Sequence, residues 1–332
     1  MKAIVLNEPA GIETAALKDQ PVPSPQPGEV RVAIKAASLN HRELWIGRGQ
    51  YPGMKLPSIL GADGAGVIEA VGEGVDQGLI GQDVVLYPAL NWGPSPDFPS
   101  KNFCLLGMPV PGTLAEYICV PADSALPKPG YLSFEAAAAF PTASLTAFRA
   151  LTVKGKTKVG DKVLITGIGG GVATFALKFA VAMGAEVYVT SGNEDNIQRA
   201  LSLGAKDGFD YKDEGWGKAA RAASGGFDVV IDGAPAASYA AYGRALNYGA
   251  RIVLYGSTSG VQFSVNAPEL FLRHATVFGT AMGNLADFAA MLAFSEEHRI
   301  EPVLHKTFAL EEISEAFAEL ERNHFGKIVV RV

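Results

Sequence analysis

The first 125 residues place short apolar runs between turns that contain proline and glycine. The opening MKAIVL, Val30–Ala36 and Gly66–Val71 are apolar runs of strand length. Pro21–Gly28 and Gly72–Gly74 have the composition of turns. This alternation predicts a β-rich first domain.

A long loop and a helix follow. Leu90–Leu106 contains polar, aromatic and proline residues and is predicted to be a loop longer than most compact domains need. The alanine-rich Ser133–Leu151 is predicted to be one helix, with Ser133 as its N-cap and Glu135 in its first turn.

From Asp161 onward the pattern changes to strands that alternate with amphipathic helices. Such alternation indicates right-handed βαβ crossovers and a parallel, doubly wound sheet. The predicted strands are Lys162–Thr166, Glu186–Thr190, Phe227–Ile231, Arg251–Tyr255 and Thr276–Thr280, and the predicted helices are Gly171–Gly184 and Asn193–Leu203.

After about Leu285 the pattern predicts two helices, Ala286–His298 and Leu310–Arg322, and a last strand, Lys327–Val332. This strand has no further βα partner, so we expect it to return to the first domain. The fold class is therefore α/β, with one domain from residues 1–125 and 285–332 and a second from residues 126–284.

Composition and charge narrow the function classes. A net charge of −6 disfavours nucleic acid and anionic membranes as partners. Met1–Ala10 reads as a strand, not as a signal peptide, and no apolar run approaches the ~18 residues of a membrane helix. The two cysteines, Cys104 and Cys119, form no C-x-x-C motif and suit a reducing cytoplasm.

The strongest motif is GIGGGVA at residues 167–173, directly after a predicted strand and before a predicted helix. Glycines in this context allow a tight turn that brings backbone N–H groups and a helix N-terminus against a pyrophosphate. An ordinary glycine-rich turn is the alternative. The expected pyrophosphate contacts are Gly167, Gly169, Gly170, Gly171 and Val172.

The end of the next strand bears on the choice of dinucleotide. NAD-binding units usually place an acidic residue there to bind the ribose 2′-hydroxyl. This chain has Thr190-Ser191-Gly192-Asn193, which leaves room for the 2′-phosphate of NADP.

Further motifs complete a resemblance to the medium-chain dehydrogenase/reductase superfamily, and within it to the zinc-less quinone-oxidoreductase-like branch. They are MKAIVL, Leu39-Asn40 followed by Tyr51-Pro52, GADGAG at 61–66, GTLAEY at 112–117, the glycine loop, Gly256 and GKIVV at 326–330. The resemblance covers essentially the whole chain. It implies a GroES-like catalytic domain and a central Rossmann domain, with the active site in the cleft between them. It also implies a homodimer or homotetramer, often paired through the last Rossmann strand, here Thr276–Thr280.

In zinc-bearing relatives, a Cys, a His and a Cys or Asp hold catalytic zinc. Carried onto this chain, those positions are Asn40, Ala62 and Thr142. None of them is a thiolate, imidazole or carboxylate. Asp63 is a lone carboxylate, and of the four cysteines of the structural zinc loop only Cys104 is present. We therefore expect no metal.

Without zinc, a substrate that spreads negative charge into an enolate or hydroquinone accepts hydride more easily than a simple carbonyl. The resemblance implies quinones, enones or 2-alkenals reduced by NADPH. It places Asn40, Trp45 and Tyr51 at the substrate, for hydrogen bonding to a carbonyl, stacking, and donation to an oxyanion. Core packing is the alternative for the two aromatic residues.

The resemblance also implies residues for the cofactor. The family places the 2′-phosphate near a serine, a lysine and a tyrosine. Here Ser191 and Tyr211 match, but position 196 is Asn196. Lys327 and Arg199 are possible substitutes for the missing cation. Gly256 and Ser257 are expected to line the nicotinamide, with Thr146 close to it.

The resulting hypothesis is a zinc-independent, NADPH-dependent quinone or enone reductase. Two alternatives stay open. One is an alcohol dehydrogenase-like enzyme with unusual metal ligands, and the other is a catalytically silent NADPH-binding sensor or structural protein.

Overall fold

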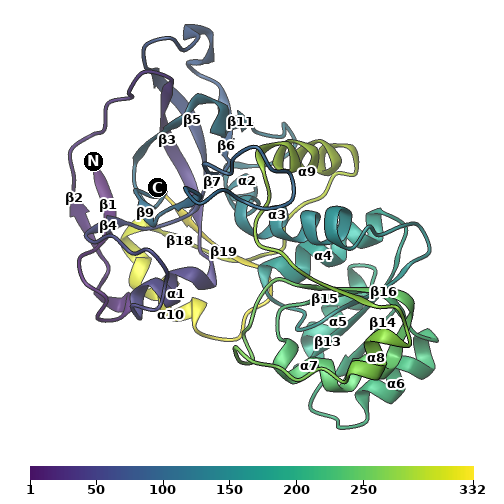
Figure 1. The fold of residues 1–332 in the computed structure, drawn as a ribbon. Coiled ribbons are helices and arrows are strands. Elements are labelled where there is room, and N and C mark those ends of the chain that lie inside the picture. Colours follow the sequence, from purple (N-terminus) through teal and green to yellow (C-terminus); the bar gives the residue numbers. More distant parts are fainter. The chain divides into compact units, whose positions relative to one another are not determined.

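The computed structural model describes residues Met1–Val332 and divides into two compact units (Figure 1). The first contains Met1–Leu145 and Gly283–Val332, and the second contains Thr146–Met282. The first boundary falls later than the expected residue 125, because helix α2 (Phe134–Ala138) packs against strands β3 (Glu29–Ser38) and β5 (Asp63–Val71) of the first unit.

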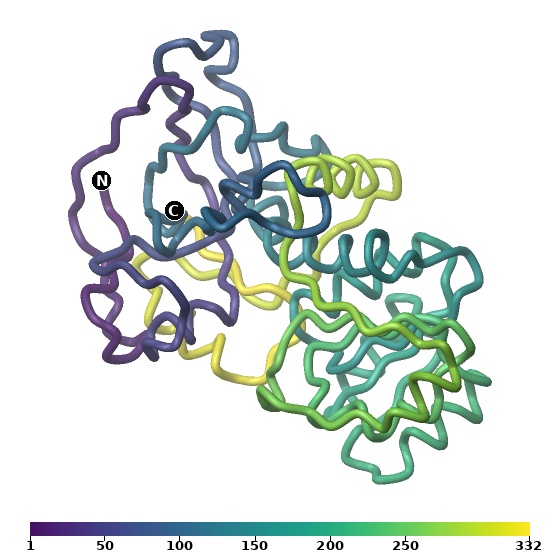
Figure 2. The backbone as a smooth tube through the Cα atoms, viewed as in Figure 1, coloured from purple at the N-terminus to yellow at the C-terminus, as the bar shows by residue number.

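The first unit is built on a sheet with the strand order β11-β6-β5-β3-β19-β18, in which β10 also pairs with β3. Strand β19 (Lys327–Arg331) runs antiparallel to β3 and parallel to β18 (Leu304–Ala309). The return of the last strand to the first domain is therefore confirmed, and Figure 2 shows this yellow segment beside the purple N-terminal part of the chain.

Besides β6, β10 and β11 of that sheet, the unit has two three-stranded sheets with the orders β2-β1-β4 and β7-β8-β9. Its other strands are β1 (Lys2–Leu6), β2 (Ala16–Asp19), β4 (Ser58–Ile59), β6 (Asp83–Leu86), β7 (Ala89–Leu90), β8 (Cys104–Leu106), β9 (Pro109–Val110), β10 (Tyr117–Pro121) and β11 (Ala125–Pro127). Its other helices are α1 (His41–Gly47), α9 (Leu285–Glu297) and α10 (Ile313–Leu320). The predicted loop Leu90–Leu106 is confirmed for residues 91–103, but its last three residues form β8.

The predicted helix Ser133–Leu151 is interrupted. Helix α2 ends at Ala138 and α3 (Pro141–Arg149) begins at a proline, followed by a π-helical turn over Ala150–Lys154. Pro141 lacks the N–H that a continuous helix would need, and its ring clashes with the preceding turn. The predicted cap is confirmed, since Ser133 Oγ accepts a hydrogen bond from Ala136 N.

The second unit is a six-stranded parallel sheet with the order β14-β13-β12-β15-β16-β17 (Figure 1). This is the Rossmann strand order, with its switch point between β12 and β15. The strands are β12 (Lys162–Ile165), β13 (Glu186–Ser191), β14 (Asp207–Asp210), β15 (Phe227–Asp232), β16 (Leu246–Leu254) and β17 (Thr276–Gly279). The helices are α4 (Gly171–Ala182), α5 (Glu194–Ser202), α6 (Trp216–Ser224), α7 (Pro235–Tyr242) and α8 (Ala267–Phe271).

The expected α/β class, with a β-rich first unit and a parallel Rossmann unit, is confirmed. Each unit has its own core, around Leu60 and Phe317 in the first and around Val230 and Ile252 in the second. No helix is long and apolar enough to span a bilayer.

Candidate functional site

Asn40 is held at the start of helix α1 by its neighbours. Leu39, Leu44 and Ile46 are buried in the core of the first unit, which fixes the register of the helix. Glu43 reaches back so that its Oε2 accepts from Asn40 N at 2.7 Å. This capping contact fixes the backbone of Asn40.

Asp63, the first residue of β5, accepts hydrogen bonds from three elements. Its Oδ2 accepts from Ser38 Oγ at 3.1 Å and from Asn40 Nδ2 at 2.9 Å. Its Oδ1 accepts from Thr142 N at 2.8 Å and from Thr142 Oγ1 at 2.5 Å. The carboxylate is completely buried, so these donors stabilise its charge.

Lys327, the first residue of β19, completes this arrangement. Its Nζ donates to Leu39 O at 2.8 Å, Asn40 Oδ1 at 2.7 Å and Asp63 Oδ2 at 3.0 Å. The side chain is only 4% exposed. We call Ser38, Asn40, Asp63, Thr142 and Lys327 the Asp63–Lys327 cluster.

The cluster sets the orientation of the Asn40 carboxamide. Its oxygen accepts from the Lys327 ammonium and its nitrogen donates to the Asp63 carboxylate. The reverse orientation would place the amide N–H groups against the ammonium and the amide oxygen against the carboxylate. One hydrogen of Nδ2 is used by Asp63. The second hydrogen has no protein acceptor, so Asn40 could donate it to a ligand oxygen.

The expected metal positions do lie together, but their chemistry does not suit zinc. Asn40 and Thr142 both bind Asp63, and Ala62 is its buried neighbour in sequence. An amide, a methyl and a hydroxyl are not the thiolate, imidazole or carboxylate ligands of zinc. Asp63 is already paired with a buried ammonium, and no group of three or more His, Cys, Asp or Glu residues could hold a metal ion.

The cluster also corrects the expectation that Lys327 substitutes for the missing 2′-phosphate cation. An ammonium has three donors, and all three N–H groups of Lys327 are used by Leu39, Asn40 and Asp63. Its burial leaves none of them for a phosphate.

Trp45 and Tyr51 differ in their surroundings. Trp45 is 44% exposed, so core packing does not explain it. Tyr51 is half-buried and packs against the core of the first unit. Its hydroxyl oxygen accepts from Arg42 Nε at 3.3 Å.

Two ionisable groups beside Asn40 have shifted pKa values. Burial raises the pKa of Glu43 to about 6, against the opposing effect of Arg42. Loss of hydration, together with the nearby His324, whose ring stacks on that of His41, lowers the pKa of His41 to about 4. At neutral pH the start of α1 therefore carries a neutral imidazole.

In the second unit, the glycine loop links β12 to α4 as predicted. Gly167 has φ 65° and Gly169 has φ 137°, values that favour glycine. Gly167 N donates to Thr190 Oγ1 and Ile168 N donates to Thr190 O, which ties the loop to the end of β13. A Cβ added at Gly167 or Gly170 would meet no atom, so open space covers the loop. These residues fit a pyrophosphate at the N-terminus of α4.

The end of β13 holds a cation that sequence reasoning missed. Ser191 is buried, and Tyr211 is 52% exposed. Lys212 Nζ donates to Gly192 O at 2.5 Å. A Cβ at Gly192 would lie 2.7 Å from the Tyr211 ring and 2.8 Å from Lys212 Cε. The space for an acidic side chain at this position is therefore filled by a tyrosine and a lysine. Asn196 instead donates to Ile168 O at 3.4 Å.

Lys212 could have been found from the sequence because it directly follows Tyr211. Only the bend of the chain after β14 shows that its stem turns back over Gly192. Arg199, the other suggested substitute, lies in the last turn of α5.

The loops after β15 and β16 approach each other closely. Thr258 N and Oγ1 both donate to Gly233 O at 3.0 Å. A Cβ at Gly256 would lie 3.2 Å from the same oxygen. Gly256 and Ser257 thus follow a strand at the carboxyl edge of the sheet, where Rossmann units bind their ligands. Thr146, at the edge of this unit, is buried.

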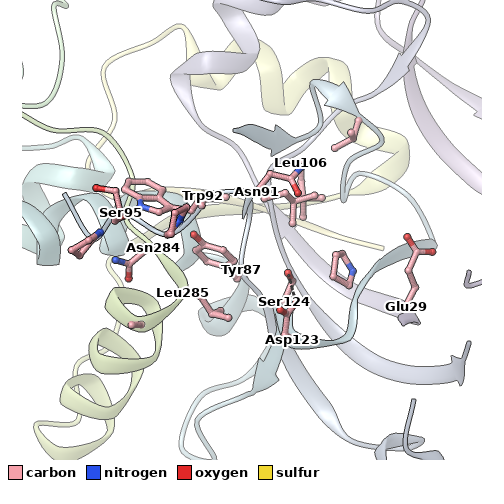
Figure 3. Close-up of a pocket in the computed structure, with 18 of the residues that line it drawn as sticks. Glu29, Tyr87, Asn91, Trp92, Ser95, Leu106, Asp123, Ser124, Asn284 and Leu285 are labelled. Carbon is pink, nitrogen blue, oxygen red and sulfur yellow. Dashed lines mark hydrogen bonds between the residues drawn. The ribbon is translucent and has the colours of Figure 1, made fainter. Parts of the chain in front are cut away.

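A cavity of about 760 Å³ in the first unit contains none of the expected site residues (Figure 3). Its polar aromatic atoms already have partners, since Tyr87 Oη donates to Gly283 O and Trp92 Nε1 donates to Ser95 O. The carboxylates of Glu29 and Asp123 also line the cavity. The cavity offers no unpaired buried donor that would mark a ligand site.

Comparisons with known proteins support the fold and the family, and several of the matched names refer to zinc or to NAD. The family "Alcohol dehydrogenase GroES-like domain" matches residues 26–130, and "Zinc-binding dehydrogenase" matches residues 171–297. A zinc-type alcohol dehydrogenase-like protein of Leptosphaeria maculans is 33% identical over 93% of this chain and 92% of its own. The quinone oxidoreductase of Rattus norvegicus is 27% identical over 99% and 97%. A crystal structure of an NAD-dependent alcohol dehydrogenase has a TM-score of 0.94 and 37% identity, with 100% of both chains covered.

Proposed function

Because this chain belongs to the medium-chain dehydrogenase/reductase superfamily of oxidoreductases, we propose that it is a zinc-independent, NADPH-dependent reductase of quinones or α,β-unsaturated carbonyl compounds. One observation carries the proposal. Where a metal would polarise a substrate oxygen, the chain has the Asp63–Lys327 cluster, which presents an Asn40 N–H donor.

A hydrogen-bond donor stabilises a developing oxyanion less than zinc does. A reaction that spreads the negative charge over a conjugated system needs less of that stabilisation, which favours an enone or quinone over a simple alcohol. When bound, the reduced nicotinamide supplies the hydride. Asn40 Nδ2 would bind the carbonyl oxygen, Trp45 would cover the face of a flat substrate, and Tyr51 would supply a proton.

For the cofactor, the residues of the glycine loop would bind the pyrophosphate. Tyr211, Ser191 and Lys212 would bind the 2′-phosphate, with Lys212 in place of the lysine that the family has at position 196. A phosphate prefers charged donors, and Lys212 supports NADPH over NADH. The two free cysteines suit the reducing cytoplasm, where we place the protein.

The main competing function is that of an NAD-dependent alcohol dehydrogenase, since a solved relative at 37% identity carries that description. That reading needs an oxygen-polarising group stronger than an amide. It also leaves Lys212 at the end of β13 without a role, because NAD has no 2′-phosphate.

We further propose a homodimer formed through the sheet edge of the second unit. Strand β17 is the last strand of that sheet and has an unpaired side. Val277 on this strand is 37% exposed, and Phe271 and Leu272 close by in sequence are also exposed. An exposed apolar edge strand is a site at which a second copy can continue the sheet.

Purified protein tests the proposed function in a steady-state assay with NADPH and NADH against quinones, enones, 2-alkenals and simple alcohols. We expect oxidation of NADPH with a quinone or a conjugated carbonyl compound. Turnover only of alcohols with NAD would establish the competing function, and cofactor binding without any turnover would favour a sensor or structural role.

A further inference from the structure

Arg42, the second residue of α1, is a buried guanidinium whose donors point at fixed acceptors. Nη1 donates to Leu106 O at 2.8 Å, Nη2 to Met108 O at 3.4 Å and Nε to Tyr51 Oη at 3.3 Å. Nη1 also lies 3.5 Å from Glu43 Oε1. Two backbone carbonyls and a carboxylate thus prevent the guanidinium from turning away from Tyr51.

The contact with Tyr51 involves both its ring and its hydroxyl. Arg42 Cζ lies 4.7 Å from the ring centroid, within the range of a cation–π interaction. Since Arg42 Nε–H occupies a lone pair of Tyr51 Oη, the hydroxyl proton of Tyr51 must point elsewhere. An arginine is always charged and can only donate, so this contact never accepts the proton of Tyr51.

We propose that Arg42 is a positioning residue that orients Tyr51 as the proton donor of the reduction. This inference rests on the proposed function. After hydride addition to the β-carbon of a conjugated carbonyl compound, the enolate takes the Tyr51 proton at its α-carbon. The O–H bond breaks, a C–H bond forms, and the electron pair stays on the phenolate beside Arg42. Water from solvent then returns a proton to Tyr51.

The buried guanidinium of Arg42 would also stabilise the negative charge that develops on Tyr51 Oη. A charge stabilises a nearby developing anion more in a low-dielectric site than in water. Another arginine–tyrosine pair of the same unit has a different geometry. Arg31 lies 5.7 Å from the Tyr117 ring and donates to Glu69 and to Pro23 O, not to the tyrosine hydroxyl. Arg31 therefore provides a matched control.

The test follows where the proton is delivered. An enone is reduced with NADPH in D2O by wild type, R42K, R42Q, Y51F, R42Q/Y51F and R31Q, and NMR gives the face of the α-carbon that receives deuterium. We expect one face for wild type and R31Q. We expect R42Q and Y51F to lose this facial preference and to lower kcat about tenfold to a hundredfold with a smaller change in KM. The double variant should match Y51F, because Arg42 acts through Tyr51.

A second readout needs no turnover. In protein labelled at tyrosine Cζ, the Tyr51 resonance, assigned by its loss in Y51F, should move in R42Q and stay in place in R31Q. R42K keeps a cation and should show a partial effect if R42Q does not fold. Retained facial preference in a folded R42Q or R42K, or an unmoved resonance, overturns the role of Arg42. Absence of enone turnover by wild type overturns the proposed function, and this inference falls with it.

Discussion

The ammonium of Lys327 lies 3.0 Å from the carboxylate of Asp63, although 264 positions separate them in sequence. Both are buried, at 4% and 0% exposure. The pair joins the last strand of the chain to β5 and fixes the Asn40 amide between them.

Breaking this pair should destabilise the first unit. K327M leaves the Asp63 carboxylate buried without a cation, and we expect it to lower the free energy of unfolding by ~3–5 kcal/mol. D63N/K327M removes both charges and should recover most of this loss. Urea unfolding measures both variants. A double variant as unstable as K327M would contradict the role of the buried charge.

Lys212 should control the preference for the phosphorylated cofactor. K212M removes a cation from the end of β13, and we expect NADPH to bind about five- to twentyfold more weakly, with NADH unchanged. Fluorescence titration measures both affinities without substrate. K218M, which changes an exposed lysine on α6, is the control. Equal weakening of NADPH and NADH by K212M would show that Lys212 does not recognise the 2′-phosphate.

Adding a second cation should strengthen binding of the 2′-phosphate. N196K restores the lysine that the family has at this position, opposite the loop carbonyl of Ile168 to which Asn196 now donates. We expect tighter NADPH binding and unchanged NADH binding in the same titration. Weaker binding of NADPH would place the phosphate elsewhere.

Glu43 should make stability depend on pH. Its pKa is about 6 in the folded protein, mainly because of burial, compared with 4.5 when exposed. Since the folded pKa is the higher one, this stabilising contribution is complete below pH 4.5 and is lost as the pH rises through 6. The group should lower the free energy of unfolding by ~2 kcal/mol over this range.

Comparison with E43Q isolates that contribution. Glutamine keeps an oxygen for Asn40 N but does not titrate. His41 acts in the opposite direction, since its lowered pKa costs stability as the pH falls toward 4. The difference between wild type and E43Q in urea unfolding therefore reports Glu43 alone. A difference that does not change between pH 4.5 and 6.5 would show that Glu43 is not shifted.

The proposed dimer can be tested on strand β17. V277K places a charge on the unpaired edge and should convert a dimer to a monomer in sedimentation velocity. V159K changes an 83% exposed residue in the loop before β12, a strand that is separated from β17 by β15 and β16, and it should leave the dimer intact. A dimer that survives V277K would exclude this edge as the interface.

The elements with strong sequence patterns were predictable. Five strands of the second unit and the loop after β12 follow from apolar runs and glycines, which act locally. The sixth strand, β14, has the sequence DGFD without an apolar run and was not predicted. Helix α6 was not predicted, and Pro141 divides a helix that alanine content alone suggested was continuous. In the first case Gly215 precedes the helix, so no capping side chain marks its start. In the second a local steric effect outweighed helix propensity.

The site was only partly predictable. Asn40 and Thr142 were singled out by motif position, but their common partner Asp63 and the cation beside it depend on long-range packing of β19 against β3. Lys327 was a possible substitute for the missing 2′-phosphate cation, and its buried contacts with Leu39, Asn40 and Asp63 exclude that role. Arg42 gave no signal, since its partners are backbone carbonyls far away in sequence.

The most direct test follows deuterium from the cofactor to the product in protein from which metal has been removed. Protein treated with a chelator, with its metal content measured by mass spectrometry, is given NADPH deuterated at carbon 4 of the nicotinamide and an enone. The account predicts full activity at negligible zinc content and deuterium at the β-carbon of the product. Activity that disappears with the metal and returns with added zinc would contradict it.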